Sequence, residues 1–398
     1  MSERSVLAVG IILLTASMVA IISRRLRLPY SVGLVSAGIA LGFFPGVAEF
    51  PLSRDLIFTV FLPPLIFQAA LEIEWRHFRV NLPVSALLAF PGVAIAAVVV
   101  TVAMHLALGW SWIGAGLFGV LIAATDPVSV LAAFKEMKVQ PRLGLLVESE
   151  SLLNDGAAAV GFTILLAAAT GAGATPLAVV GSFAWTVAGG VVVGTLTSAL
   201  LLLIAGRTED HLVEITLTTI AAYGSFLVAE NFSMSGVLAT LTAGLLVGNV
   251  GWRGAISTAG RPHVLAFWEY AAFLANSIIF ILIGGHEAQQ PLGIFVGSSA
   301  LAIVVVLIGR AAAIYPLCGL VAPTRLRVDL RYQHLLVWGG LRGALALALA
   351  LALPSDIRER GEIIVVAFAV VAFSIFVQGL TMPWLARRLA IAQQATET

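Results

Sequence analysis

Long apolar runs with almost no charge occupy nearly the whole of this sequence. Sixty per cent of the 398 residues are hydrophobic and 11% are charged, whereas a soluble domain carries about 25% charged residues. Apolar runs of about 20 residues are typical of membrane-spanning helices, because that length of helix crosses the hydrocarbon core of a bilayer. The runs do not alternate with polar residues as the strands of a membrane barrel do. The sequence therefore predicts an all-α polytopic membrane protein.

Turn residues and charges divide these runs into 13 predicted spans. They cover 6–24, 30–46, 54–72, 82–107, 112–134, 142–170, 176–205, 211–230, 233–250, 263–285, 292–320, 331–353 and 361–386. No stretch is long or polar enough to form a second, soluble domain. We therefore predict one transmembrane domain over 1–398, in which 387–398 form a short cytoplasmic tail.

The basic residues are distributed unevenly between the two sides of these spans. Of 22 lysines and arginines, 16 lie in loops on one side and 4 in loops on the other, which leaves two. Because basic loops stay in the cytoplasm, we expect a multi-pass protein of the cell inner (plasma) membrane, with the N-terminus outside and the C-terminus in the cytoplasm. The two remaining residues, Arg310 and Arg342, fall inside predicted spans.

The span 112–134 contains a carboxylate next to a proline, Asp126 and Pro127. Proline removes a backbone donor and clashes with the preceding turn, so the helix is expected to bend or unwind there. In a membrane, freed carbonyls are tolerated only where protein or water satisfies them. Carbonyl oxygens are also hard ligands that suit small cations, and many transporters build ion sites from unwound helices.

The span 142–170 carries the densest group of polar side chains in any predicted span. Ser151, Asn154 and Asp155 are spaced i, i+3, i+4, so they share one helix face and offer a hydroxyl, an amide oxygen and a carboxylate to one ion. Glu150 projects to a neighbouring face. Intramembrane charges cost about 2.5–3.5 kcal/mol each and mark ion pathways or pairs. The intramembrane charges are then three acids and two arginines, namely Asp126, Glu150, Asp155, Arg310 and Arg342. One carboxylate is therefore left without a fixed counter-charge.

At these motifs the chain resembles the NhaP-type sodium/proton exchangers of the monovalent cation/proton antiporter superfamily. The resemblance covers essentially the whole chain and is carried by four stretches: 61–67 (FLPPLIF), 124–130 (ATDPVSV), 148–155 (ESESLLND) and 339–344 (GGLRGA). The pair formed by the second and third stretches is highly specific, whereas a lone GG or LRG would be weak.

The resemblance implies a 13-helix fold with two inverted six-helix repeats, over about 6–170 and 211–386, joined by a linking helix over 176–205. It implies broken helices that cross at the fifth and twelfth spans, a homodimer, and transport by an elevator-like movement.

It also implies roles for the charged residues. Asp155 would bind Na⁺ or a proton, and Ser151, Asn154, Thr125 and Asp126 would complete the site. The same match implies that Glu150 is the structural partner of Arg310. It also implies that Arg342 compensates the charge at the crossing of the broken helices.

The chain departs from the family pattern at Gln68, where an acidic residue is common. An amide oxygen still makes Gln68 an auxiliary ligand candidate, but it adds no charge. The departure leaves the choice between Na⁺, Li⁺ and K⁺ open.

A lone buried carboxylate suggests a mechanism, because the site becomes neutral when it binds either one proton or one monovalent cation. The empty, charged site is costly to carry through a medium of low dielectric constant. We therefore predict a secondary active antiporter that exchanges a monovalent cation for H⁺, 1:1 and electroneutrally, with competition at Asp155. No nucleotide-binding motif appears, and the expected partners are cations, protons and the lipid bilayer, with no cofactor.

Three other classes of protein fit the sequence less well. A passive cation channel would use Asp126 and Asp155 as a charged constriction. An organic-anion symporter would need more basic groups at its site. An intramembrane enzyme is disfavoured because the histidines lie near span ends or in loops and the single cysteine, Cys318, cannot form a metal cluster.

Overall fold

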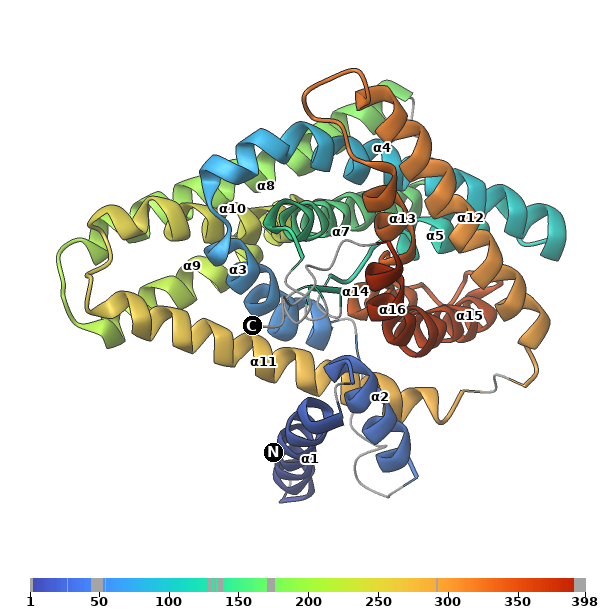
Figure 1. Cartoon of the computed structure of the whole chain (residues 1–398), viewed down its shortest axis with the longest axis horizontal. Helices are drawn as coiled ribbons and strands as arrows, with labels where there is room; N and C mark the ends of the chain where they lie inside the picture. Colours follow the sequence, from blue (N-terminus) through green and yellow to red (C-terminus); the bar gives the residue numbers. More distant parts are fainter. Residues whose placement is uncertain are drawn as a thin grey trace. The chain divides into compact units, whose positions relative to one another are not determined.

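The fold is known from a computed structural model, which describes residues 3–26, 28–43, 53, 55–127, 130–131, 134, 139–169, 176–290 and 293–389. All regular structure in these ranges is helical (Figure 1), which confirms the all-α class. The helices are α1 (Glu3–Leu26), α2 (Tyr30–Leu41), η1 (Leu56–Phe61), α3 (Leu62–Glu72), α4 (Trp75–Leu108), α5 (Trp112–Leu121), α7 (Pro141–Ala169), α8 (Pro176–Ala205), α9 (His211–Asn231), α10 (Gly236–Asn249), η2 (Gly251–Arg253), α11 (Gly260–Glu287), α12 (Val296–Val321), α13 (Leu330–Trp338), α14 (Ala344–Leu351), α15 (Arg360–Phe373), η3 (Ser374–Gly379) and α16 (Leu380–Arg388).

The protein is an integral, multi-pass membrane protein. Eight helices in the described ranges are long and apolar enough to cross a bilayer, and shorter apolar helices accompany them. Most predicted spans coincide with one helix or with consecutive ones. The spans 30–46 and 112–134 contain α2 and α5, and parts of the remainder, 44–46, 128–129 and 132–133, lie outside the described residues. One difference is at α4, which begins at Trp75 rather than at residue 82. The polar residues before 82, for which the sequence predicts a loop, extend the helix beyond its apolar run.

Some of the residues behind the predicted orientation lie outside the described residues, including Arg27, Arg54 and Lys135. So do residues 390–398, most of the predicted tail. The orientation, the tail and the two inverted repeats therefore stay predictions.

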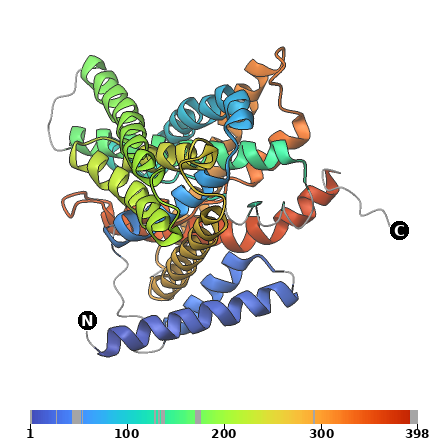
Figure 2. The same ribbon diagram turned by 90° about the vertical axis from the view of Figure 1, so that its left-hand side faces the viewer.

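Two compact units make up the chain, and each is assembled from segments that are far apart in the sequence. Unit 1 contains Met1–Arg54, Asn81–Ala158 and Ser277–Thr398, and unit 2 contains Asp55–Val80 and Ala159–Asn276. In unit 1, α1 and α2 lie side by side (Figure 2).

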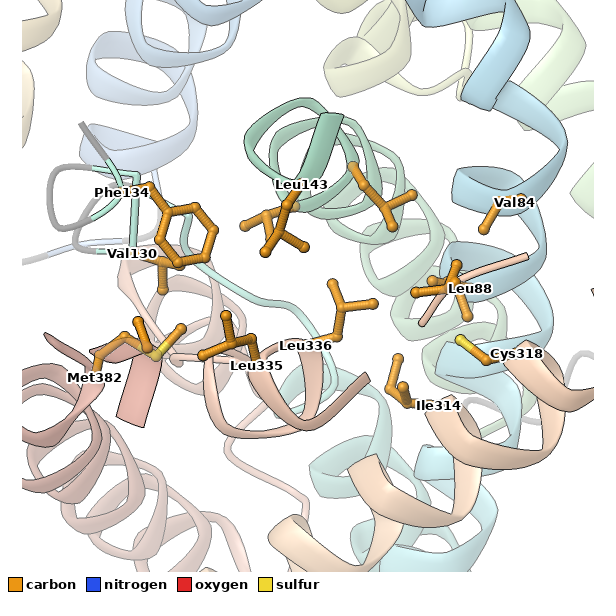
Figure 3. Packing of buried hydrophobic residues seen from close by; sticks show 14 of the residues in the cluster. Val84, Leu88, Val130, Phe134, Leu143, Ile314, Cys318, Leu335, Leu336 and Met382 are labelled. Carbon is orange, nitrogen blue, oxygen red and sulfur yellow. The ribbon is translucent and has the colours of Figure 1, made fainter. Parts of the chain in front are cut away.

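A cluster of buried aliphatic side chains forms a core of unit 1. Leu335 and Leu336 of α13 pack with Leu143 of α7, Leu88 of α4 and Ile314 of α12 (Figure 3). Burial of each such side chain contributes about 1.5–3 kcal/mol relative to exposure to water. This packing fixes α13 against three longer helices, so its end at Trp338 is held in place.

Unit 2 has its own core, which includes Phe67 and Leu71 of α3, Val247 of α10 and Trp268 of α11. The ring centroids of Phe67 and Trp268 are 4.5 Å apart. Helix α10 approaches α3 so closely that a Cβ at Gly248 would lie 2.2 Å from the Leu71 carbonyl oxygen. Small residues allow this kind of helix contact in membranes, and here they fix the helix that carries Gln68.

Two helices of unit 1 are interrupted inside the predicted spans. After α5 the chain is non-helical over residues 122–127, which we call the first break. Between α13 and α14 it is non-helical over residues 339–343, which we call the second break. The two breaks touch, because the Asp126 N–H donates to the Leu341 carbonyl over 2.7 Å. A Cβ at Gly343 would lie 2.6 Å from the Asp126 Cβ, so the crossing needs glycine there.

Candidate ion-binding site

The first break ends a helix whose last carbonyls need partners. Arg342, which is 2% exposed, directs Nη1 at these carbonyls, 2.6 Å from the Ala123 oxygen and 3.1 Å from the Ala124 oxygen. A helix C-terminus carries partial negative charge, which a guanidinium offsets. Arg342 comes from the second break, so each interrupted segment helps to stabilise the other.

The second break leaves the carbonyls at the end of α13 without helical partners. Nε and Nη2 of Arg310 both donate to the Leu336 carbonyl over 3.2 Å. Gln378, which is 2% exposed, donates from Nε2 to the Trp338 carbonyl over 2.8 Å. Gln378 lies in η3, a π-helical turn, and such turns often occur at functional positions. Two side chains from other helices therefore fix the end of α13.

Sequence reasoning missed Gln378. A signal was present, because a glutamine in an otherwise apolar span is costly unless it has a partner. The sequence does not show that a π-turn directs it at a broken helix.

Glu150 and Arg310 form a buried ion pair in unit 1. Nη1 of Arg310 lies 2.8 Å from Oε1 of Glu150, and Nη2 lies 2.9 Å from Oε2. The two residues are 1% and 7% exposed. This two-point geometry is the strong form of an arginine–carboxylate contact. Arg310 therefore joins α12, α7 and the end of α13.

Asn154 connects that ion pair to the first break. Its Nδ2 donates to Glu150 Oε1 over 2.9 Å and to Thr125 Oγ1 over 2.6 Å. Its Oδ1 accepts from the Thr125 N–H over 3.2 Å. Both ends of the amide are engaged by protein groups, so Asn154 braces the unwound backbone. The ligand role predicted from its spacing stays a prediction.

Ser151 and Thr125 place oxygen atoms side by side at the first break. The Ser151 hydroxyl donates to the Thr125 carbonyl, and the two hydroxyl oxygens are 3.2 Å apart. Ser151 is 1% exposed and Thr125 is 4% exposed. The sequence had predicted that these two residues would share a site, and the structure brings them together. Hydroxyl and carbonyl oxygens of this kind are suitable ligands for a small cation.

Asp155 differs from its neighbours because its carboxylate forms neither a hydrogen bond nor an ion pair with any residue that the structure describes. It keeps some exposed surface, whereas Asn154 beside it has none. An unpaired charge in a largely buried place is costly. A proton or a cation would relieve that cost.

The charges of this cluster sum to −1 when every group is ionised, from three carboxylates (Asp126, Glu150 and Asp155) and two guanidiniums (Arg310 and Arg342). Glu150 is matched by Arg310, and Arg342 lies on the carbonyls just before Asp126. One mobile positive charge therefore makes the cluster neutral.

Gln68 lies in unit 2 on α3, where its Nε2 donates to Oε1 of Glu72 over 2.6 Å. The side chain is thus engaged by the acid one helical turn further along. Its role as an auxiliary ligand stays a prediction.

Comparison with known proteins gives consistent results. The family described as "Sodium/hydrogen exchanger, transmembrane" matches residues 12–388. The low-affinity Na⁺/H⁺ antiporter NhaS1 of Synechocystis is 37% identical over 96% of this chain and 73% of its own length. The Na⁺/H⁺ antiporter ApNhaP of Aphanothece halophytica is 37% identical over 98% of this chain and 75% of its own length.

A solved structure has the same fold. The sodium proton antiporter MjNhaP1 of Methanocaldococcus jannaschii matches with a TM-score of 0.77, over 97% of this chain and 99% of that chain. The sequence identity is 19%, so this match bears on the fold alone. The curated relatives named above are transporters, and none of their names describes an enzyme.

Proposed function

Because the chain belongs to the sodium/hydrogen exchanger family, we propose that it exchanges a small monovalent cation, Na⁺ in the first instance, for a proton, and that the two compete for Asp155. The observation that carries this proposal is the unpartnered Asp155 carboxylate in a cluster whose other charges are held by protein groups. Such a group favours any ion that neutralises it.

Asp155 supplies the negative charge of the proposed site, and neutral oxygens surround the ion. The Ser151 hydroxyl and the Thr125 carbonyl are already in contact, so an ion close to one is close to the other. Asp126 and Asn154 complete the site, Asp126 through water and Asn154 by holding Thr125 in its unwound conformation. Oxygen donors of this type suit Na⁺ and Li⁺, and K⁺ is the larger alternative.

The stoichiometry follows from the charge of the cluster. Loaded with one proton or one monovalent cation, the cluster is neutral. Empty, it carries −1, and moving a net charge through a low-dielectric interior costs several kcal/mol. Only loaded states therefore pass easily between the two sides, which gives alternating access and 1:1, electroneutral exchange. We place the protein in the plasma membrane with a cytoplasmic C-terminus, as a homodimer.

Replacement of Asp155 tests the proposal. Asp155→Asn keeps the shape of the side chain but has no charge and takes up no proton, so cation-driven proton movement in proteoliposomes should be abolished. The matched control is Asp356→Asn, which changes an exposed aspartate and should exchange normally. Persistent exchange by Asp155→Asn in a correctly folded sample would end the proposal. Assays with Li⁺, Na⁺ and K⁺ in turn would give the cation preference.

An imposed membrane potential separates this proposal from a passive cation channel. Electroneutral exchange should proceed at the same rate at any potential, because no net charge crosses. A channel would conduct continuously, without proton coupling and in proportion to the driving voltage. Voltage-dependent exchange that still requires a proton gradient would show that more than one proton moves per cation.

A further inference from the structure

Glu287, the last residue of α11, is a buried carboxylate that the proposed exchange reaction does not use. It is 5% exposed. Both of its carboxylate oxygens are buried, and neither has a hydrogen-bond partner in the part of the chain that the structure describes. Buried polar atoms almost always have partners, and an unpaired buried charge is costly. These oxygens therefore indicate a missing partner.

The end of α11 meets the end of α2 at this position. Both segments belong to unit 1, and α2 lies beside the C-terminal part of α11 (Figure 1). At the start of the contact, the Tyr30 hydroxyl lies 2.8 Å from the Ser277 hydroxyl. Near its end, a Cβ at Gly42 would lie 2.8 Å from the Gly285 carbonyl oxygen. From the first of these contacts to the second, the residue numbers rise in α2 and also in α11, so the two helices run in the same direction.

Glycines bring the two backbones very close together. A Cβ at Gly38 would lie 2.2 Å from the Ile281 carbonyl oxygen, and a Cβ at Gly284 would lie 2.2 Å from the Val35 carbonyl oxygen. Because the helices are parallel, this contact places their C-terminal ends next to each other, at Leu41 and Glu287.

Three sources of negative charge thus lie at the joined ends of the two helices. Each helix C-terminus carries a partial negative charge, and the Glu287 carboxylate adds a full one. The last turn of α2 contains no basic residue, and that of α11 contains only His286. His286 directs Nδ1 at the Leu282 carbonyl over 3.0 Å. Within the described ranges, no basic side chain forms an ion pair with Glu287.

We propose that Glu287 is the centre of a second cation site, separate from Asp155, at the joined C-terminal ends of α2 and α11. A single carboxylate at two helix C-termini is a hard, monoanionic site, and a small alkali cation such as Na⁺ or Li⁺ neutralises it. A cation bound there holds α2 against α11 and is not part of the exchange cycle. The proposal does not depend on the proposed function.

Thermal unfolding in the Asp155→Asn background isolates this site, because the exchange site has then lost its charge. Samples in NaCl are compared with samples in N-methyl-D-glucamine chloride of equal ionic strength. With Na⁺ at ten times its Kd, the Tm should rise by about 1–2 °C. In Asp155→Asn with Glu287→Gln the sodium response should vanish. Glu269→Gln, an exposed change on the same helix, is the matched control and should keep the response.

A second variant keeps the test available if Glu287→Gln disturbs the fold. Glu287→Lys supplies a covalently attached cation at the same helix ends, so the protein should elute as a folded species in sodium-free buffer and show no sodium response. A response absent from Asp155→Asn itself, or one that survives in either double variant, would overturn the proposal.

Discussion

The two breaks of unit 1 perform similar tasks with different chemistry. At the second break, Arg310 and Gln378 satisfy the carbonyls that end α13. At the first break, Arg342 covers two carbonyls, while Ser151 and Asn154 engage Thr125. Asp155, close by, keeps an unpartnered carboxylate. On the proposed function, the second break is a scaffold and the first break is the binding site. A scaffold mutation should lower stability and turnover, whereas a binding-site mutation should change cation affinity.

Loss of the Glu150–Arg310 ion pair should have the largest effect. Glu150→Gln leaves a buried guanidinium uncompensated, and breaking a buried pair costs about 3–5 kcal/mol. We expect a large fall in the Tm of purified protein and poor recovery from membranes. Replacing Glu150 and Arg310 together by Gln and Leu should recover part of that loss, because no charge is left unpaired. A normal Tm for Glu150→Gln alone would show that the pair does not support the scaffold.

Loss of the Gln378 amide should have the next largest effect. Gln378→Leu leaves the Trp338 carbonyl buried without a donor, which costs about 1–3 kcal/mol. Because the change is at the second break, turnover and Tm should both fall while the KM for Na⁺ stays close to its original value. Thr381→Val, which removes a hydroxyl that accepts from the Trp338 indole over 2.9 Å at the same break, is the matched comparison. A raised KM with normal turnover would place Gln378 with the binding site instead.

Ser151→Ala should separate affinity from stability at the first break. Losing one neutral oxygen ligand should raise the KM for Na⁺ roughly 5–10-fold, which corresponds to about 1–1.4 kcal/mol. Ser149→Ala is the control, because that hydroxyl lies on the same helix but contacts Ser85 over 2.7 Å. If the KM of Ser151→Ala is unchanged and only its Tm falls, the first break is a scaffold like the second.

The N-terminal end of α5 should add a small, pH-dependent contribution to stability. Ser111 caps α5 by accepting from the Gly114 N–H, and it donates its own N–H and hydroxyl to Glu359 over 2.9 and 3.0 Å. Burial raises the pKa of Glu359, but the Ser111 hydrogen bonds outweigh it, and the net pKa lies below its ordinary value.

A pKa that is lower in the folded state adds stability above the unfolded-state value, about 4.3, and this stability is lost as the pH falls through the folded value. Glu359→Gln should therefore lower the Tm slightly at pH 7 and leave it nearly unchanged at pH 3.5. The reverse pattern would contradict the assigned hydrogen bonds.

Much of the fold could be predicted from the sequence, because long apolar runs in a membrane admit few structures other than helices. The spacing of Ser151 and Asp155 also pointed to the candidate site, since helical periodicity alone places them on one face; their role as ligands stays a prediction. The brace formed by Asn154 could not be predicted, because it depends on where Thr125 lies after α5 unwinds. The contact made by Gln378 could not be predicted for a similar reason, since a π-turn sets the direction of its side chain.

Counting the protons released when a cation binds tests the central claim most directly. Purified protein is titrated with NaCl in buffers of different ionisation enthalpy, at a pH where the site is largely protonated. With Glu287 replaced by Gln, binding of one Na⁺ should release close to one proton, and Asp155→Asn in that background should show neither the binding nor the release. Sodium binding without proton release, or binding that is unchanged in Asp155→Asn, would contradict competition at this carboxylate.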